Sequence, residues 1–211
     1  MCNLDEYDMI FNRLNSKFTG DISKNILTHE PLIFNCGTSN ELTQLLDESM
    51  KVEFSGFETV LFNKQLTNLI HCPVTAKGSY IIPDTVETIG IEAFAKCKNV
   101  TSVRIPLSLK SIGCLAFESC ISLTTILIPD SVIEMGFRIF SNCTGLTSIY
   151  VQAKSPMKLD IDSDIFYNVD TDNGILYVPQ GTKKYYQHAN QWRKFKNIVE
   201  TESFQHLSTL N

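Results

Sequence analysis

A repeat of 23 residues in the middle of the chain constrains its fold more than any other feature. Three consecutive stretches align without a gap: IPDTVETIGIEAFAKCKNVTSVR (82–104), IPLSLKSIGCLAFESCISLTTIL (105–127) and IPDSVIEMGFRIFSNCTGLTSIY (128–150). Each begins with Ile-Pro and carries aliphatic, Gly, Phe and Cys residues at matching positions. Because one such unit cannot bury its apolar side alone, neighbouring units must stack on one another. The repeat therefore predicts a solenoid.

Each unit is expected to contain one strand and one return segment. The segment VTSVRI (100–105) alternates in polarity at its end, which predicts a short strand. Pro106 ends this strand, because proline cannot donate a hydrogen bond within a sheet. Strands of successive coils would pair in parallel, ~4.8 Å apart. The recurring phenylalanines fill the core, and the recurring glycines stand where φ is positive or the backbone approaches a neighbour closely. These residues are Phe94, Phe117 and Phe140, and Gly90, Gly113 and Gly136.

The consensus IPxxVxxIGxxAFxxCxxLTSVxIP, repeated over 82–151, resembles the BspA-like (treponemal-type) leucine-rich repeat of bacterial surface proteins. The match departs only at Met135 and at RIF (138–140), where Ile139 replaces Ala. The resemblance implies an α/β repeat fold, a right-handed leucine-rich-repeat solenoid with a short-stranded parallel sheet and a helical C-terminal cap. It also implies surface exposure and adhesion to host or bacterial macromolecules.

The segment before the regular repeats falls into two parts. Residues 58–81 are similar to the hairpin-bearing first coil of the same family, with the apolar runs VLFN and NLIHC joined by KQLT. Residues 1–57 show no repeat, and two capping-box spacings within them predict helices. This region is expected to form a helical N-terminal cap, with an unrelated small domain as the alternative.

The segment after the regular repeats is expected to close the stack. Residues 152–200 resemble an atypical last coil followed by the C-terminal cap of the family. Within it, TKKYYQHANQWRKF predicts a helix with Tyr185, Ala189 and Trp192 on one face. Residues 201–211 are expected to form a tail.

Composition indicates a folded chain without the basic face of a nucleic-acid binder. The 211 residues are 43% hydrophobic and 19% charged, with a net charge of −5. No apolar run approaches the ~20 residues of a membrane helix. The opening MCNLDEYDMIFN is acidic and lacks the apolar stretch of a secretory signal. The family resemblance implies a cell-surface or secreted protein, and a cytoplasmic one is the alternative if no signal was removed.

Cys97, Cys120 and Cys143 recur with the repeat and raise the question of metal or redox chemistry. A zinc site needs ligands that converge, commonly as C-x₂₋₄-C pairs, and these cysteines have no such partners. In a solenoid they form a column with parallel Cβ vectors, which is poor geometry for a disulfide. The sequence predicts a structural ladder of free thiols that donate weakly to backbone carbonyls.

The remaining candidate metal-binding and catalytic residues do not form a recognisable site. His71 and Cys72 are neighbours on a predicted strand, so their side chains point to opposite faces and cannot share a metal. Asp160, Asp162 and Asp164 alternate, but the Gly and Glu of a calcium loop are missing, which favours a surface turn. Phosphate-binding, dinucleotide-binding and nucleophile-elbow motifs do not occur. We therefore predict no catalytic residues, no metal and no cofactor.

One face of the predicted sheet is the candidate binding site. Arg104 points outward, and extending its register through the stack gives an outward column of large side chains: Ile81, Arg104, Leu127, Tyr150 and Tyr177. The neighbouring column is small and polar: Ser79, Ser102, Thr125 and Ser148. Exposed apolar surface with a polar rim often marks an interaction site. Coverage of this face by the N-terminal segment, or no role at all, are the alternatives.

These observations predict a non-catalytic protein-recognition module that binds through the sheet face, with cell-surface adhesion or macromolecule binding as its role. The expected partner is a protein, such as a host or extracellular-matrix protein, or a glycan. A glycan-binding surface module and an intracellular scaffold are the alternative functions.

Overall fold

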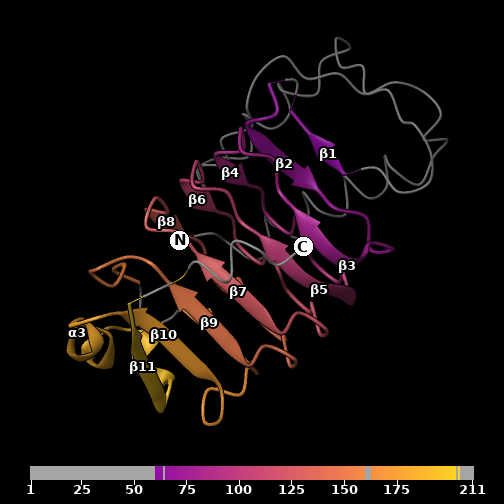
Figure 1. The fold of residues 1–211 in the computed structure, drawn as a ribbon. Coiled ribbons are helices and arrows are strands. Elements are labelled where there is room, and N and C mark those ends of the chain that lie inside the picture. The colour runs from indigo at the N-terminus through magenta and orange to yellow at the C-terminus, as the bar shows by residue number, and fades with distance from the viewer. Residues whose placement is uncertain (1–59, 64, 160–162, 203, 205–211) are drawn as a thin grey trace, which may run out of the picture.

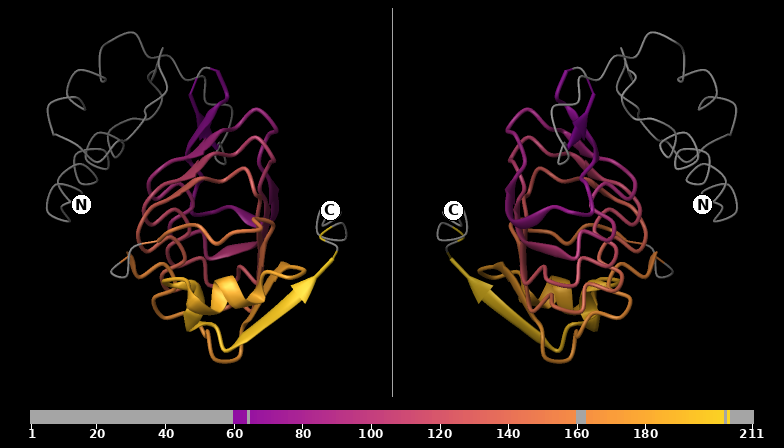
Figure 2. Two further views of the ribbon diagram at one scale, coloured as in Figure 1. Left: turned by 90° about the vertical axis from the view of Figure 1, so that its left-hand side faces the viewer. Right: turned by 90° about the vertical axis from the view of Figure 1, so that its right-hand side faces the viewer.

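The computed structural model describes residues 60–63, 65–159, 163–202 and 204, which coil into a stack with one sheet on each side (Figure 1). Figure 2 shows the coils following one another from β2 at one end to α3 at the other. In chain order the elements are β1 (Leu61–Phe62), β2 (Asn68–His71), β3 (Lys77–Ile81), β4 (Thr88–Ile89), β5 (Asn99–Arg104), β6 (Ser111–Ile112), β7 (Thr125–Ile128), β8 (Glu134–Met135), β9 (Ser148–Val151), β10 (Ile175–Pro179), α3 (Lys183–His188), η2 (Trp192–Lys194) and β11 (Asn197–Thr201).

The larger sheet has six strands in the order β11-β10-β9-β7-β5-β3, and all of its neighbouring strands are parallel. Its register follows the repeat: Ser102 pairs with Thr125, and Thr125 pairs with Ser148. The predicted parallel-strand solenoid with a spacing of about 23 residues is therefore confirmed. From β5 through β7 to β9, the outward positions of one coil therefore lie beside the equivalent positions of the next.

A second sheet, which the sequence did not predict, runs along the return side in the order β1-β2-β4-β6-β8. Its strands β4, β6 and β8 have two residues each, and they pair in parallel at Ile89–Ile112 and Ile112–Met135. The described repeats over 82–151 contain turns but no helix, so the expected α/β repeat is wrong for this part of the chain. The physical reason is close backbone approach, which lets successive coils hydrogen-bond directly on this side.

That close approach explains the recurring glycines. The Gly113 amide donates to the Ile89 carbonyl at 2.8 Å, and a Cβ added to Gly113 would lie 2.6 Å from the Ile91 nitrogen. Glycine is therefore required at Gly90, Gly113 and Gly136 by the close approach of the neighbouring backbone, and not by a positive φ. The positive φ angles fall instead on two non-glycine residues of each regular coil: Glu92 and Lys96, Leu115 and Ser119, Arg138 and Asn142.

A stack of aromatic rings runs through the core. The Phe94 and Phe117 ring centroids are 5.1 Å apart, and those of Phe117 and Phe140 are 5.6 Å apart, with nearly parallel planes. Phe166 continues the stack 5.9 Å beyond Phe140, although the coil between them is longer. Phe195 then closes it edge-on, 4.9 Å from Phe166. One ring from each coil thus ties that coil to its neighbours.

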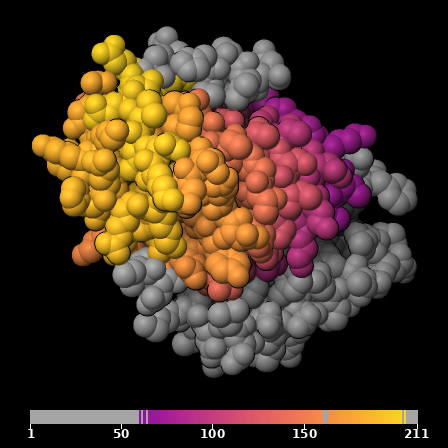
Figure 3. All heavy atoms as spheres, turned by 90° about the horizontal axis from the view of Figure 1, so that it is seen from below, coloured from indigo at the N-terminus to yellow at the C-terminus, as the bar shows by residue number. Residues whose placement is uncertain are grey.

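The C-terminal cap is less helical than predicted. The helix ends at His188, Ala189 is extended, and Gln191 has a φ of 65°, so only the 3₁₀ turn η2 follows. The predicted buried face is wrong at Tyr185, which is 50% exposed, whereas its neighbour Tyr186 is buried. The Tyr186 hydroxyl donates to the Ala153 carbonyl at 2.6 Å. Trp192 is also buried. Figure 3 shows this part of the chain, in yellow, at one end of the stack.

The entry to the stack is a hairpin. β1 and β2 pair antiparallel, with Phe62 opposite Leu69. The Asn63 carboxamide oxygen accepts hydrogen bonds from the backbone amides of Thr67 and Asn68, both at 2.8 Å, and so holds the turn. The helices predicted within residues 1–57 lie outside the described residues. Among the described helices, none has the length and apolar character needed to cross a membrane.

Candidate interaction surface

The outward side chains of the six-stranded sheet form one continuous line, which we call the sheet-face column. Ile81 pairs with Arg104 across β3 and β5, and Leu127 pairs with Tyr150 across β7 and β9. Tyr150 pairs with Tyr177, and Tyr177 pairs with Val199 of β11. The β5–β7 register, with Ser102 opposite Thr125 and Val103 opposite Ile126, sets Arg104 beside Leu127. The sheet-face column comprises Ile81, Arg104, Leu127, Tyr150, Tyr177 and Val199.

The column is exposed at its two ends and partly exposed between them. Ile81 and Val199, at its two ends, are 49% and 42% exposed, and the four side chains between them are half-buried. Apolar side chains with this exposure are not needed for the core, which is formed by the inward-facing residues of the same strands. Beside the column runs a small polar row, in which Ser79 is exposed and Ser102, Thr125 and Ser148 are half-buried. An apolar line with a polar border is the pattern expected of an interaction surface.

The column has a charged end and an aromatic end. At the charged end, the Arg104 guanidinium lies 3.1 Å from the Asp84 carboxylate, and both groups are accessible to water. Such an exposed pair contributes little to stability, so Arg104 remains available to a partner. At the aromatic end, the Tyr150 and Tyr177 rings stack with centroids 4.2 Å apart and planes within 4° of parallel. Burial, together with the neighbouring Tyr177, raises the pKa of the Tyr150 phenol.

Two members of this surface were missed by sequence reasoning. Val199 was missed because the column was extended only as far as Tyr177, whereas β11 adds a further parallel strand. The alternation in NIVET, with Ile198 buried and Val199 exposed, is the signal that could have identified it. Phe204 lies edge-on to Tyr150, with ring centroids 6.4 Å apart and planes at 82°. No pattern in the sequence indicates that contact.

The cysteine column lies inside the stack, away from this surface. Cys97, Cys120 and Cys143 are fully buried, and none of them forms a disulfide. The Cys120 thiol donates to the Phe94 carbonyl at 3.0 Å, and the Cys143 thiol donates to the Phe117 carbonyl at 2.9 Å. The sulfur of Cys143 and burial both raise the pKa of the Cys120 thiol. A buried thiol with a raised pKa is a poor nucleophile, so Cys120 is suited to packing rather than to chemistry.

We expect all three thiols of this column to react with a thiol reagent once the chain is unfolded without reductant. The reason is that each sulfur lies within hydrogen-bonding distance of a backbone carbonyl of the preceding coil, and none of the three cysteines forms a disulfide. Peptide mass spectrometry would count the labelled cysteines, and a sample reduced beforehand serves as the control. Fewer labelled column cysteines in the unreduced sample would contradict the free-thiol ladder.

The other candidate residues do not converge. His71 is exposed while Cys72 is buried, so the pair is divided between two faces. Asp164 lies 3.5 Å from the Lys194 ammonium and 3.9 Å from the Arg138 guanidinium, which offset its charge. Asp160 and Asp162 lie outside the described residues. Within the described ranges, no group of three or more His, Cys, Asp or Glu residues is arranged to hold a metal ion.

Comparison with known proteins identifies the repeat. The model of the BspA type leucine-rich repeat region matches residues 74–208 in six copies. No curated protein matches the chain. A leucine-rich repeat protein from Eubacterium ventriosum is 23% identical over 67% of this chain and 38% of its own, with a TM-score of 0.48. The pneumococcal vaccine antigen PcpA is 16% identical over 68% of this chain and 46% of its own, with a TM-score of 0.44.

A leucine-rich repeat protein from Bacteroides ovatus is 16% identical over 72% of this chain and 68% of its own, with a TM-score of 0.28. The chain spans less than half the length of the first two of these structures. The family match confirms the resemblance deduced from the 23-residue repeat. Because the family model covers well over half of the sequence, this protein belongs to the BspA-type leucine-rich repeat family.

Proposed function

We propose that this protein is a non-catalytic protein-recognition module that binds its partner along the sheet-face column. The observation that carries this proposal is the continuity of the column: six large side chains lie in register on six adjacent strands, at positions where the repeat does not require them. Tyr and Arg, which both occur in it, are the residue types enriched in binding hot spots. Family membership is consistent with protein binding.

The dimensions of the column favour an extended protein segment as the partner. Five strand spacings of ~4.8 Å give the column a length of about 24 Å. Its apolar line and hydroxyl border suit a partner chain that lies across the strands and inserts apolar side chains between the column residues. We propose a cell-surface or secreted location in a bacterium, and adhesion to host or extracellular-matrix proteins as the role, because the family resemblance implies both.

A glycan is a weaker candidate for this surface. Sugars pack on the open face of an aromatic ring, but Tyr150 and Tyr177 cover each other's faces at 4.2 Å. Their outer faces are directed along the column toward Leu127 and Val199. The surface therefore presents ring edges and hydroxyls rather than a free stacking platform. A glycan-array assay of the intact chain would test this alternative directly.

Replacing Leu127 and Tyr150 together with Asp is expected to abolish partner binding and leave the fold intact. Both side chains are half-buried on the outer face, so two carboxylates there would be tolerated by the core but not by a desolvated apolar interface. Peptides selected for binding the wild-type chain from a random display library would be measured against the double variant by calorimetry.

The matched control is Ser102→Asp with Thr125→Asp, which adds the same charge in the neighbouring polar row. Circular dichroism would show that both variants fold. Equal affinity of the selected peptides for the wild-type chain and for the Leu127→Asp, Tyr150→Asp variant would refute the column as the binding site.

A further inference from the structure

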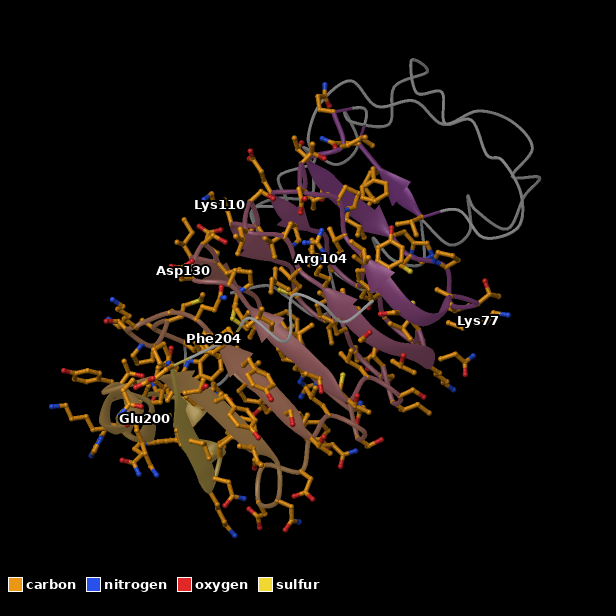
Figure 4. All side chains as sticks on the ribbon, viewed as in Figure 1. Lys77, Arg104, Lys110, Asp130, Glu200 and Phe204 are labelled. Atoms are coloured by element: carbon orange, nitrogen blue, oxygen red, sulfur yellow. The ribbon has the colours of Figure 1, made fainter. Side chains whose placement is uncertain are left out.

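Phe204 occupies a position that the preceding strand does not predict. β11 ends at Thr201 and pairs only with β10, whereas the Phe204 ring contacts Tyr150 on β9. Phe204 therefore lies two strands away from β11, beside β9 on the outer face of the sheet. Figure 4 shows Phe204 lying over that face.

The contact has the geometry of a specific aromatic interaction. The two ring centroids are 6.4 Å apart with planes at 82°, which is the edge-to-face arrangement that aromatic pairs prefer. Tyr150 is at the same time stacked face-to-face on Tyr177, so three rings form one cluster at the aromatic end of the column. Phe204 itself is half-buried, although it lies outside every strand and helix.

The reach of the chain is sufficient for this contact to form within one molecule. Phe204 follows Thr201 by three positions, and three extended residues span about 10 Å. Two strand spacings, from β11 across β10 to β9, amount to ~9.6 Å. The segment, together with the lengths of the two aromatic side chains, allows Phe204 to reach Tyr150, so a second copy of the chain is not needed.

We propose that Phe204 is a tethered occupant of the aromatic end of the sheet-face column, and that a protein partner displaces it by inserting an aromatic side chain of its own beside Tyr150. This inference rests on the proposed function for its second half only. The first half, occupancy by the chain's own Phe204, stands on the ring contact and the chain length. Ile81 and Arg104, at the other end of the column, stay open for the partner's first contacts.

Tyrosine nitration of the intact chain tests the occupancy. Phe204→Ala is expected to raise the nitration rate of Tyr150 severalfold, measured by peptide mass spectrometry against Tyr185 as the internal reference, because Tyr185 is half-exposed and lies outside the column. Glu202→Ala is the matched control, since Glu202 is exposed on the same segment and its loss should leave the rate unchanged. The peptide TESFQHLSTLN, added to the Phe204→Ala variant, should restore protection of Tyr150.

Three results would overturn the proposal. An unchanged Tyr150 rate in Phe204→Ala would mean that the ring does not occupy the column in solution. Protection of the wild-type chain that is lost on dilution would assign the occupant to a second copy. Equal protection by the same peptide with Ala in place of Phe would remove the aromatic requirement. None of these results depends on the display-selected peptides, so failure here is separate from failure of the proposed function.

Discussion

Replacing Phe117 with Ala is expected to lower the free energy of unfolding by about 3–5 kcal/mol, the usual cost of removing a buried aromatic ring. Phe117 is fully buried, and its ring lies between Phe94 at 5.1 Å and Phe140 at 5.6 Å. Truncation therefore removes two ring contacts at once and opens a cavity between two coils. Because each coil of a solenoid is stabilised mainly by its neighbours, the loss falls on the middle of the stack.

Chemical denaturation followed by circular dichroism would measure this loss. Leu107→Ala is the control, because Leu107 is 69% exposed and lies in the same coil. The control should change the free energy of unfolding by less than about 0.5 kcal/mol. A Phe117→Ala variant as stable as this control would show that the ring stack does not hold the coils together.

Replacing Gly113 with Ala is expected to destabilise the fold by about 1–3 kcal/mol, the range for forcing an extra methyl group into a packed interior. The new Cβ would lie 2.6 Å from the Ile91 nitrogen and 2.7 Å from the Gly90 carbonyl carbon. Both atoms belong to the backbone, so no side chain can rotate away to relieve the clash. The two coils must separate, which also strains the 2.8 Å hydrogen bond from the Gly113 amide to the Ile89 carbonyl.

A second glycine at the same repeat position provides an internal comparison. A Cβ on Gly90 would lie 3.1 Å from the Leu69 carbonyl oxygen, a milder contact, so Gly90→Ala should cost less than Gly113→Ala. Lys110→Ala, an exposed change in the segment before Gly113, controls for mutation in this coil. Thermal unfolding would rank the three variants. The explanation by close backbone approach fails if Gly113→Ala is no less stable than Lys110→Ala.

The column could be located from sequence because a parallel solenoid converts a period into a register. Once Ser102 and Thr125 are known to be 23 residues apart, their strands must place them side by side, as they are in the structure. The same spacing of 23 residues places Leu127 beside Tyr150, and the two residues do pair in the structure. The extension ended at Tyr177, because the segment after it was assigned to the cap, whereas Val199 of β11 follows Tyr177 by 22 residues and pairs with it.

The features that could not be predicted depend on contacts rather than on local pattern. Strands of two residues, such as Thr88–Ile89, are too short to show an alternation, and they form only because glycines let the backbones meet. The helix over 183–188 ends early at a backbone turn centred on Gln191, where no Gly or Pro signals a stop. The contact of Phe204 with Tyr150 is purely tertiary.

The left-handed backbone positions affect how much destabilising change the repeat can tolerate. Each regular coil places ordinary side chains, such as Glu92 and Leu115, in a conformation that costs an L-residue about 1–2 kcal/mol. Asn142 and Asn168 already carry the type that tolerates it best after glycine. The solenoid is thus less stable than its own geometry permits. Substitution to Asn at the remaining left-handed positions would increase the stability of the fold. That gain could offset the loss of stability caused by changes on the binding face.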